Sequence, residues 1–210
     1  MIDRLDLERY ERLSQHRTCD LADVMQRSHT MLGVRGIYSP IPRAAGPATT
    51  VSIPNGGFEM IRLALSHAQP GDVLVIATQG NTRFAHWGGD LSREALEAGV
   101  RGVIIDGAAR DAEEVRGLGF PVYATATATA ATVVDAPWGQ INSPVSCGQT
   151  VVSPGDIVVA DENGVVAVPP EFVQAVTEAA DALAAFELPP IAGVAERLHG
   201  LGLVVDGVAP

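Results

Sequence analysis

Residues 87–114 read WGGDLSREALEAGVRGVIIDGAARDAEE, and within them a helix, a short strand and a second helix follow one another. Residues 91–98 have helical periodicity and end at Gly99, the residue type that most often follows the last turn of a helix. Residues 102–106 then predict a strand, and residues 111–117 return to a helical pattern. This order of elements indicates an α/β fold.

The same alternation continues on both sides of this stretch. Upstream, residues 58–68 have helical periodicity, a Pro-Gly-Asp turn ends that helix, and the apolar run 73–77 suits a buried strand. Downstream, residues 121–124 resume a strand. In such layered α/β architectures the active-site loops gather where strands end and helices begin. The loops at 78–91 and 106–111 are therefore the candidate site loops.

The N-terminal part of the chain predicts two helices followed by strands. Apolar and aromatic residues within 5–15 are spaced as on one face of a helix, and Thr18 or Asp20 is placed to cap a second helix that runs to Met25. Residues 33–54 are rich in Gly and Pro around short β-branched stretches, which is typical of strands and turns.

The C-terminal part predicts a hairpin and a helix. Strands at 156–160 and 165–168 flank residues 161–164, an Asp-Glu-Asn-Gly sequence typical of a tight turn. After two prolines, residues 171–186 carry one apolar stripe at helical spacing, so we expect a helix that packs on a sheet. The tail to residue 210 has no clear period, and we expect it to be irregular.

Length and composition favour one globular domain over residues 1–210. The chain is 47% hydrophobic and 19% charged, which is typical of a protein with a packed core. Its formal net charge is −11, from 14 basic and 25 acidic side chains, so we expect no direct binding to nucleic acid and none to a membrane. An acidic surface is able to dock on a basic protein segment, although solubility is the commoner reason for such a charge.

Cysteine usage and the N-terminus favour a cytoplasmic location. Cys19 and Cys147 are the two cysteines, and neither belongs to a redox or metal-binding motif. The first 17 residues alternate charged with apolar side chains, and no window approaches the roughly 20 apolar residues that a membrane span needs. We therefore expect neither export nor membrane insertion.

The first candidate loop contains Gly88 and Gly89, followed by Asp90 and Leu91. Glycine lets the backbone approach a ligand closely, and the N–H groups at a helix start bind anions. We therefore predict that these four residues bind a substrate carboxylate.

The second candidate loop continues into Arg110, Asp111 and Glu114. Asp111 and Glu114 stand three residues apart, so on a helix their carboxylates share a face and suit one hard cation such as Mg²⁺ or Mn²⁺. Arg110 beside them is placed to anchor a substrate. The alternative is that the two acids only complement the positive end of a helix while Arg110 makes a surface ion pair, and spacing alone favours this alternative.

Several other residues near these loops predict structural roles. Trp87 is expected to pack, and His86 is expected to be a packing or surface residue, because an isolated histidine is rarely a metal ligand. Asp106 is either an acid that supports the site or a strand-end residue that bonds backbone amides. The alternating run 123–132 suits a two-faced strand.

A wider set of segments carries a family resemblance over about residues 18–170. The segments are AGPATTV (45–51), PGDVLV (70–75), AHWGG (85–89), VIIDGAARD (103–111) and PGDIVVAD (154–161). In order and spacing they resemble the RraA-like family, which includes regulator of ribonuclease activity A and 4-hydroxy-4-methyl-2-oxoglutarate aldolase. The resemblance implies the swivelling β/β/α sandwich of that family and a homotrimer or a dimer of trimers.

The site residues match one of two patterns in that family. One pattern is an aspartate, twenty residues, then Arg-Asp; the other has a glycine first and an additional acid three residues after the last Asp. Gly89, Arg110, Asp111 and Glu114 match the second pattern. The resemblance thereby implies a metal-dependent lyase for small 2-oxo acids rather than a catalytically silent regulator.

The implied mechanism passes through the enolate of pyruvate. Asp111 would anchor Mg²⁺ or Mn²⁺, largely through water, and Glu114 would support it. Arg110 would neutralise the enolate oxygen or a carboxylate, and the amides of residues 88–91 would bind the substrate carboxylate. Retro-aldol cleavage of a 4-hydroxy-2-oxo acid and decarboxylation of oxaloacetate both give this enolate, so the sequence does not rank the two.

Three alternatives stay open. The first is a regulator that binds a ribonuclease. The second is a lyase for a different, sugar-acid-derived 2-oxo acid, because residues 55–58 and 77–79 depart from the usual text of the family. The third, methyl transfer to a quinone, is disfavoured, because no glycine-rich loop with a following ribose-binding acid is present.

Overall fold

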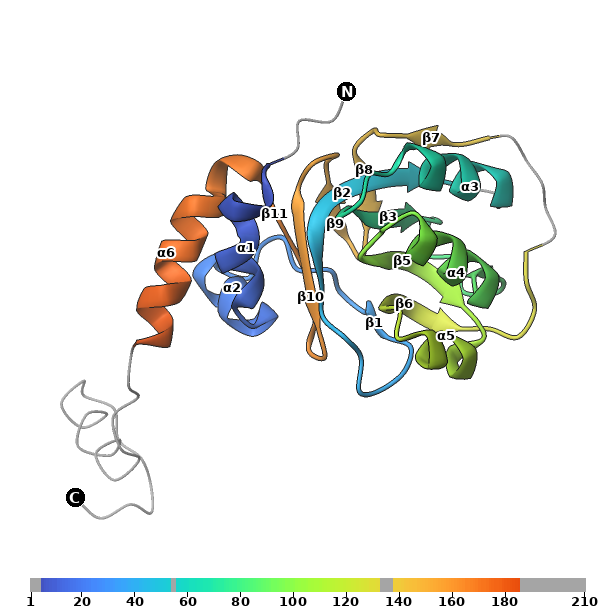
Figure 1. The fold of residues 1–210 in the computed structure, drawn as a ribbon, viewed down its shortest axis with the longest axis horizontal. Coiled ribbons are helices and arrows are strands. Elements are labelled where there is room, and N and C mark those ends of the chain that lie inside the picture. The colour runs from blue at the N-terminus through green and yellow to red at the C-terminus, as the bar shows by residue number, and fades with distance from the viewer. Residues whose placement is uncertain (1–4, 54–55, 133–137, 186–210) are drawn as a thin grey trace, which may run out of the picture.

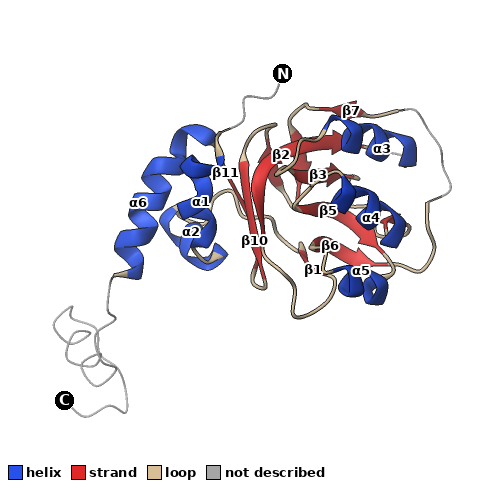
Figure 2. Cartoon of the chain, in the orientation of Figure 1, coloured by secondary structure: helices blue, strands red, loops and turns tan. Residues whose placement is uncertain are grey.

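A mixed β-sheet lies between two groups of helices (Figures 1 and 2). The computed structural model describes residues 5–53, 56–132 and 138–185. Helices α1, α2 and α6 cover one side, and α3, α4 and α5 cover the other. The helices are α1 (Leu7–Gln15), α2 (Thr18–Val24), α3 (Phe58–His67), α4 (Gly89–Glu97), α5 (Ala112–Leu118) and α6 (Val173–Ala184). Among the described residues, no helix is long and apolar enough to cross a membrane.

The sheet has the strand order β1-β6-β5-β3-β2-β10-β11, with β4 beside β5 and β7 beside β2. Strands β2, β3, β5 and β6 are parallel, whereas β1, β10 and β11 pair antiparallel. The end strands β1 and β11 contact each other, so the sheet is nearly closed. The strands are β1 (Arg35–Gly36), β2 (Ala44–Ser52), β3 (Val73–Ala77), β4 (Ala85–Trp87), β5 (Gly102–Ala109), β6 (Val122–Thr127), β7 (Gln140–Ile141), β8 (Val145–Cys147), β9 (Thr150–Val152), β10 (Ile157–Asp161) and β11 (Gly164–Val168).

Strand β10 separates two apolar cores. Val158 and Ala160 face the larger core, which includes the buried faces of α3, α4 and α5. Ile157 and Val159 face the smaller core beneath α1, α2 and α6. Successive side chains of a strand point to opposite faces, so one apolar run supplies both cores. The predicted α/β class is confirmed.

Most predicted elements are present, with differences at their ends. The strand at 73–77 is confirmed residue for residue, and the hairpin of β10 and β11 turns at the predicted place. The C-terminal helix is preceded by a 3₁₀ turn at Pro170–Phe172 and ends at Ala184. The expected irregular tail, and the last residue of the predicted helix, lie outside the described residues.

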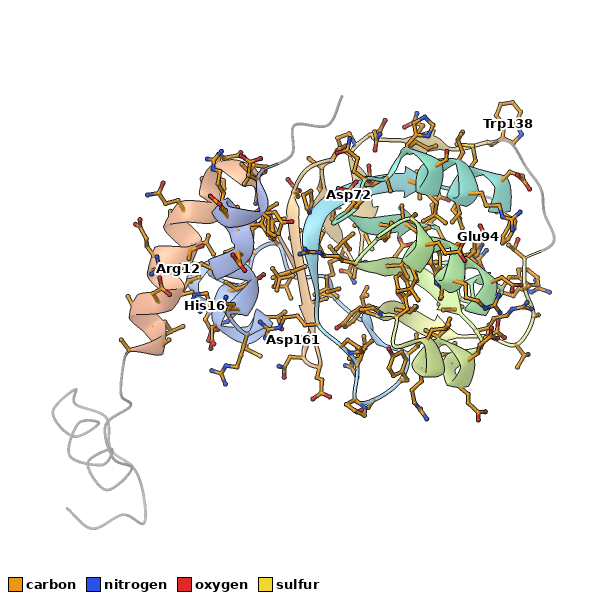
Figure 3. All side chains as sticks on the ribbon, viewed as in Figure 1. Arg12, His16, Asp72, Glu94, Trp138 and Asp161 are labelled. Atoms are coloured by element: carbon orange, nitrogen blue, oxygen red, sulfur yellow. The ribbon has the colours of Figure 1, made fainter. Side chains whose placement is uncertain are left out.

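Two local predictions are wrong. Neither Thr18 nor Asp20 caps α2; instead the Asp161 side chain of β10 accepts hydrogen bonds from the Thr18 N–H (2.9 Å) and hydroxyl (2.6 Å) (Figure 3). The strand expected within 123–132 ends at Thr127, because beyond it the chain leaves β5 and pairs with Ala85 of β4. Both differences come from partners that are distant in the sequence.

Candidate active site

The two candidate loops meet at the carboxyl ends of β4 and β5. Trp87 lies beside Ala109, and the N–H of Arg110 donates to the carbonyl of Trp87 at 2.9 Å. Gly88 and Arg110 are therefore neighbours, and α4 and α5 begin immediately after them. A register shift in the pairing of β4 with β5 accompanies this arrangement. Strand β4 was not predicted, because three residues are too few to show a period.

Carboxylates of the second loop lie close to both glycines. A Cβ on Gly88 would lie 2.5 Å from Oδ2 of Asp111, and a Cβ on Gly89 would lie 2.3 to 2.5 Å from the carboxylate atoms of Glu114. The Glu114 carboxylate thus occupies the space of a side chain at position 89. An aspartate at position 89 would direct its own carboxylate into the same region.

Asp111 is held in an unusual backbone conformation at the start of α5. Its φ of 58° and ψ of 37° are left-handed, a region that costs most residues energy but that aspartate tolerates. Its Oδ2 accepts the N–H of Gly89 at 3.2 Å and contacts Nε of Arg110, also at 3.2 Å. The carboxylate is therefore directed at the glycine loop.

Glu114 is held by an arginine that sequence reasoning missed. Arg93 of α4 donates to Oδ1 of Asp90 at 2.8 Å and to Oε1 of Glu114 across the α4–α5 contact. The Asp90 side chain is 77% exposed, so the predicted contribution of Asp90 to substrate binding is limited to its backbone. The buried Leu91 likewise offers a ligand only its N–H. The i, i+3 spacing of Asp90 and Arg93 was visible in the sequence, but the Glu114 partner was not.

Trp87 and Ser92 hold the glycine turn in place through two hydrogen bonds. The indole N–H of Trp87 donates to Oγ of Ser92 at 2.9 Å, and that hydroxyl donates to the carbonyl of Gly88 at 2.9 Å. The Trp87 ring is buried and stacks on Phe120 with 6.2 Å between ring centroids. The predicted packing role of Trp87 is confirmed, and Ser92 adds a positioning contact that was not predicted.

Two hollows flank Arg110 and Asp111. A cavity of about 100 Å³ lies on the glycine side, and a larger hollow of about 500 Å³ lies on the other side. The smaller cavity is lined by Phe58, residues 85–91, Arg110, Asp111, Ala131 and Thr132. The larger hollow is lined by Ile37, Arg110, Asp111, Ala112, Thr127, Ala128 and Thr129. Arg110 and Asp111 alone belong to both.

The donor set suits a hard cation that keeps part of its water. Within residues 5–53, 56–132 and 138–185, no group of three or more His, Cys, Asp and Glu side chains could hold a metal ion. Mg²⁺, however, is usually held by one or two carboxylates and several waters, and Asp111 and Glu114 supply two directed carboxylates. These residues therefore fit a Mg²⁺ or Mn²⁺ ion that is shared with water and substrate.

Two titratable groups near β4, His86 and Asp106, are buried. Burial lowers the pKa of His86, against the opposing effects of the Phe84 backbone and of the charge of Asp106. Burial raises the pKa of Asp106, whose Oδ1 accepts the N–H of Thr78 at 2.5 Å. Of the two roles weighed for Asp106, the bond to a backbone amide is the one present.

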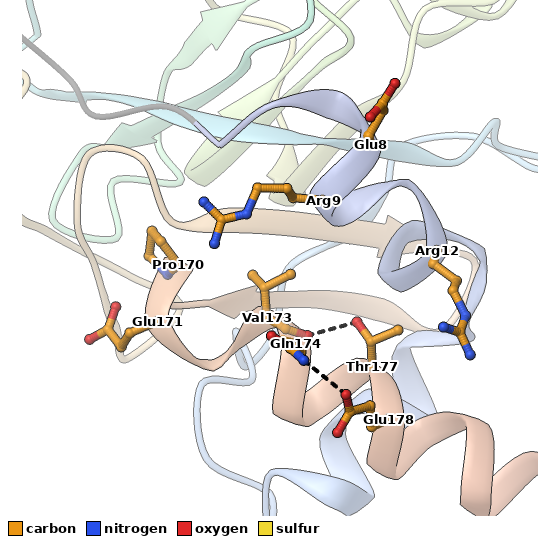
Figure 4. A pocket seen from close by; sticks show the side chains of 9 residues that line it. All are labelled: Glu8, Arg9, Arg12, Pro170, Glu171, Val173, Gln174, Thr177 and Glu178. Carbon is orange, nitrogen blue, oxygen red and sulfur yellow. Dashed lines mark hydrogen bonds between the residues drawn. The ribbon is translucent and has the colours of Figure 1, made fainter.

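A separate hollow of about 360 Å³ lies between α1 and the start of α6 (Figure 4). Two of its polar side chains bond within α6: the Thr177 hydroxyl donates to the Val173 carbonyl at 2.7 Å, and the Gln174 amide donates to Glu178 at 3.0 Å. It has neither a glycine loop nor carboxylates directed at a common point. This hollow is larger than the cavity beside the glycine loop, but it is therefore the weaker candidate for an active site.

Comparisons with known proteins find similar sequences and similar folds over most of this chain. The model of the RraA-like family, described as Aldolase/RraA, matches residues 18–167. A protein of Thermus thermophilus named 4-hydroxy-4-methyl-2-oxoglutarate aldolase is 31% identical over 156 residues, which cover 73% of this chain and 92% of that protein. Both glycines, Arg110, Asp111 and Glu114 lie within the matched family region.

One further protein is similar to this chain in sequence, and one is similar in structure. A Halalkalibacterium halodurans protein named "Putative 4-hydroxy-4-methyl-2-oxoglutarate aldolase" is 36% identical over 127 residues, and the alignment spans only 60% of each chain. The crystal structure of Streptomyces coelicolor RraAS2, described as an unusual member of the RNase ES inhibitor RraA protein family, superposes with a TM-score of 0.79. That pair is 29% identical and covers 87% of this chain and 95% of the other.

Proposed function

The chain belongs to the RraA-like family and has its fold, and we propose that it is a divalent-metal-dependent lyase that releases pyruvate from small 2-oxo acids. The observation that carries the proposal is the Glu114 carboxylate in the space beside Gly89, next to Asp111 and Arg110. Asp111, Arg110 and the start of α4 line one cavity, and the Glu114 carboxylate lies beside Gly89, which belongs to the same lining.

Each part of this cavity has a role in the proposed reaction. The N–H groups at the start of α4 bind the substrate carboxylate, because helix N-termini attract anions. Arg110 neutralises the oxygen that gains negative charge as the bond breaks. Asp111 and Glu114 would hold Mg²⁺ or Mn²⁺, which would supply Lewis-acid stabilisation of negative charge on the substrate.

The proposed reaction needs only the substrate and protons exchanged with solvent. In a 4-hydroxy-2-oxo acid the C3–C4 bond breaks, its electron pair passes to C3, and the C4 hydroxyl loses its proton to solvent and becomes a carbonyl. The pyruvate enolate then takes a proton from solvent at C3. In oxaloacetate the C4 carboxylate leaves as CO₂ and the same enolate forms.

The composition supports this charge-stabilised route over an imine route. All 14 basic residues of the sequence are arginines, and there is no lysine among the 210 residues. Aldolases that work through a Schiff base need a lysine amine as nucleophile. An enolate stabilised by a metal ion and Arg110 needs none.

Pyruvate release tests the proposal. Purified protein is mixed with oxaloacetate or 4-hydroxy-4-methyl-2-oxoglutarate, and pyruvate is followed by coupling to lactate dehydrogenase. We expect turnover with Mg²⁺ or Mn²⁺ above the metal-only background, loss of turnover with a chelator, and inhibition by oxalate, which resembles the enolate. An absence of metal-dependent pyruvate from either acid would remove the lyase proposal.

A second candidate is a protein that regulates a ribonuclease. The RraAS2 structure is described as belonging to an inhibitor family, and the net charge of −11 suits docking on a basic protein segment. The carboxylates at positions 111 and 114 favour the lyase. Salt-sensitive binding to a ribonuclease together with inactivity in the pyruvate assay would reverse this order. We also propose the homotrimer or dimer of trimers of the family, which light scattering tests directly.

A further inference from the structure

We propose that Phe58 excludes substrates with a branch at C3, so that the chain releases pyruvate in preference to 2-oxobutanoate. The inference rests on the proposed lyase function and adds a specificity-determining residue to it. The observation that carries it is an aromatic ring in the lining of the cavity at the glycine loop, held by an arginine that is bonded to α4.

The cavity at the glycine loop has a polar and an apolar part. The polar part consists of the N–H groups at the start of α4, Arg110 and Asp111, which take the carboxylate and the 2-oxo group in the proposed reaction. The apolar part includes Phe58, Ala85 and Ala131. C3 is the carbon of pyruvate that carries no oxygen, so its favourable place is against the apolar part.

Phe58 is the large apolar side chain of the described lining that is still partly exposed. Trp87 and Leu91 line the cavity too, but they are only 1% and 2% exposed and belong to the larger apolar core. Phe58 begins α3 and packs against that core from its edge. A substrate group in the cavity can therefore contact the Phe58 ring, whereas Trp87 and Leu91 are already enclosed by protein.

Arg62 holds the Phe58 ring. It follows Phe58 by one turn in α3, and its guanidinium carbon lies 5.0 Å from the ring centroid, which is a cation–π distance. Nη2 of Arg62 also donates to Oε1 of Glu94 at 2.5 Å, and Glu94 lies in α4, one turn after Asp90 (Figure 3). One ion pair thus joins the aromatic wall to the helix whose first N–H groups take the carboxylate.

The small size of the cavity makes this wall selective. The cavity measures about 100 Å³, against about 500 Å³ for the hollow on the other side of Arg110. A methyl group on C3 would need space beside a ring that is held on two sides, and added bulk in a packed site is unfavourable. One methylene in an apolar pocket changes kcat/KM by about 10- to 200-fold. We expect the lower part of this range, because the Phe58 ring is partly exposed.

Two substrates that differ by one methyl group test the inference. Oxaloacetate loses its C4 carboxylate as CO₂ and gives the pyruvate enolate; 3-methyloxaloacetate loses CO₂ in the same way and gives the enolate of 2-oxobutanoate. Each enolate takes a proton from solvent at C3. Release of CO₂ is followed for both, and each rate is divided by the rate with metal ion alone. We expect kcat/KM to be about 10- to 50-fold higher for oxaloacetate. Equal values or a preference for the methyl compound overturns the inference.

Removal of the ring should widen the specificity. In Phe58→Ala we expect kcat/KM for 3-methyloxaloacetate to rise about fivefold or more, with no rise for oxaloacetate. Phe58→Leu keeps an apolar side chain and should narrow the ratio of the two substrates in the same direction. Leu63→Ala is the matched control, because Leu63 lies in the same helix, is 46% exposed and is not part of the cavity lining. A parent-like ratio in both Phe58 variants, or an equal change in Leu63→Ala, overturns the inference.

Product inhibition gives a second measurement, which applies to any substrate that the protein cleaves. Pyruvate should inhibit the parent about tenfold more strongly than 2-oxobutanoate, and Phe58→Ala about equally with both. Equal inhibition of the parent by the two acids overturns the inference and leaves the lyase function in place. A parent that releases no metal-dependent pyruvate from any of the proposed acids overturns the lyase function, and this inference with it.

Discussion

Two of the ion-pair contacts that join neighbouring helices differ in what surrounds them. In the first, Arg12 of α1 and His16, which directly follows α1 (both labelled in Figure 3), contact Asp181 of α6, with 3.1 Å between Nε2 of His16 and the carboxylate. In the second, Arg93 of α4 contacts Glu114 of α5. The first lies over the smaller apolar core, and the second lies beside Gly89, where two strands end. Similar pairs therefore join two scaffold helices in one place and hold a carboxylate beside the glycine loop in the other.

The largest expected effect comes from removing the carboxylate nearest the glycine loop. Asp111→Gly should reduce metal-dependent pyruvate release by about 100-fold or more, because a directed ligand is lost. Glycine accepts the left-handed φ of 58°, so the thermal midpoint should stay close to that of the parent. Asp111→Ala should lose the same activity and also some stability. Full activity in either variant would show that Asp111, like Asp181 in the scaffold ion pair, has no role in pyruvate release.

The next effect tests the close contact between positions 89 and 114. Gly89→Ala puts a Cβ 2.3 to 2.5 Å from the Glu114 carboxylate and should lower kcat/KM by about 10- to 100-fold through displacement of that group. Glu114→Ala should lose activity as well. The double variant Gly89→Asp with Glu114→Ala should recover part of it, because the carboxylate then comes from position 89. No recovery would mean that the two positions do not share one role.

A smaller effect compares the two ion pairs directly. Arg93→Ala should lower kcat/KM by about fivefold or less, because Glu114 keeps its place beside Gly89 but loses its anchor. Arg93→Lys should restore part of the loss. Arg12→Ala is the matched control: it should leave pyruvate release unchanged and cost at most about 1 kcal/mol of unfolding free energy. Equal loss of activity in Arg93→Ala and Arg12→Ala would show that the two ion pairs do not differ in their effect on catalysis.

The smallest effect concerns pH and the buried His86. Burial lowers the pKa of His86, so the unfolded chain binds a proton more readily than the folded chain. This contribution to stability is complete above about pH 6.5 and is lost as pH falls below that value. His86→Leu should therefore flatten the decline of the urea midpoint between about pH 6.5 and 5. The raised pKa of Asp106 contributes with the opposite sign, and the charge of His86 also lowers the pKa of Asp106, so the comparison is confined to this pH range.

Much of the fold follows from local patterns. The apolar run of β3 was predicted residue for residue, because a strand buried on both faces has no polar interruptions. The helices α3, α4 and α5 were placed within a few residues. Strand β4 is not predicted by the sequence, and β5 runs three residues beyond its predicted end, to Ala109. That extension matters, because it brings Arg110 beside Trp87.

The sequence by itself determined the α/β alternation, the two loops that carry the site, and the chemistry available there: two carboxylates, arginine as the one strongly basic side chain, and glycines at a helix start. Periodicity and residue type report on a single element, so these features needed no knowledge of distant contacts. The tertiary structure alone decided that Glu114 fills the space beside Gly89, that Arg93 holds it, and that neutral threonines line the larger hollow. Those facts depend on strand register and on the contact between α4 and α5, which join residues more than twenty positions apart.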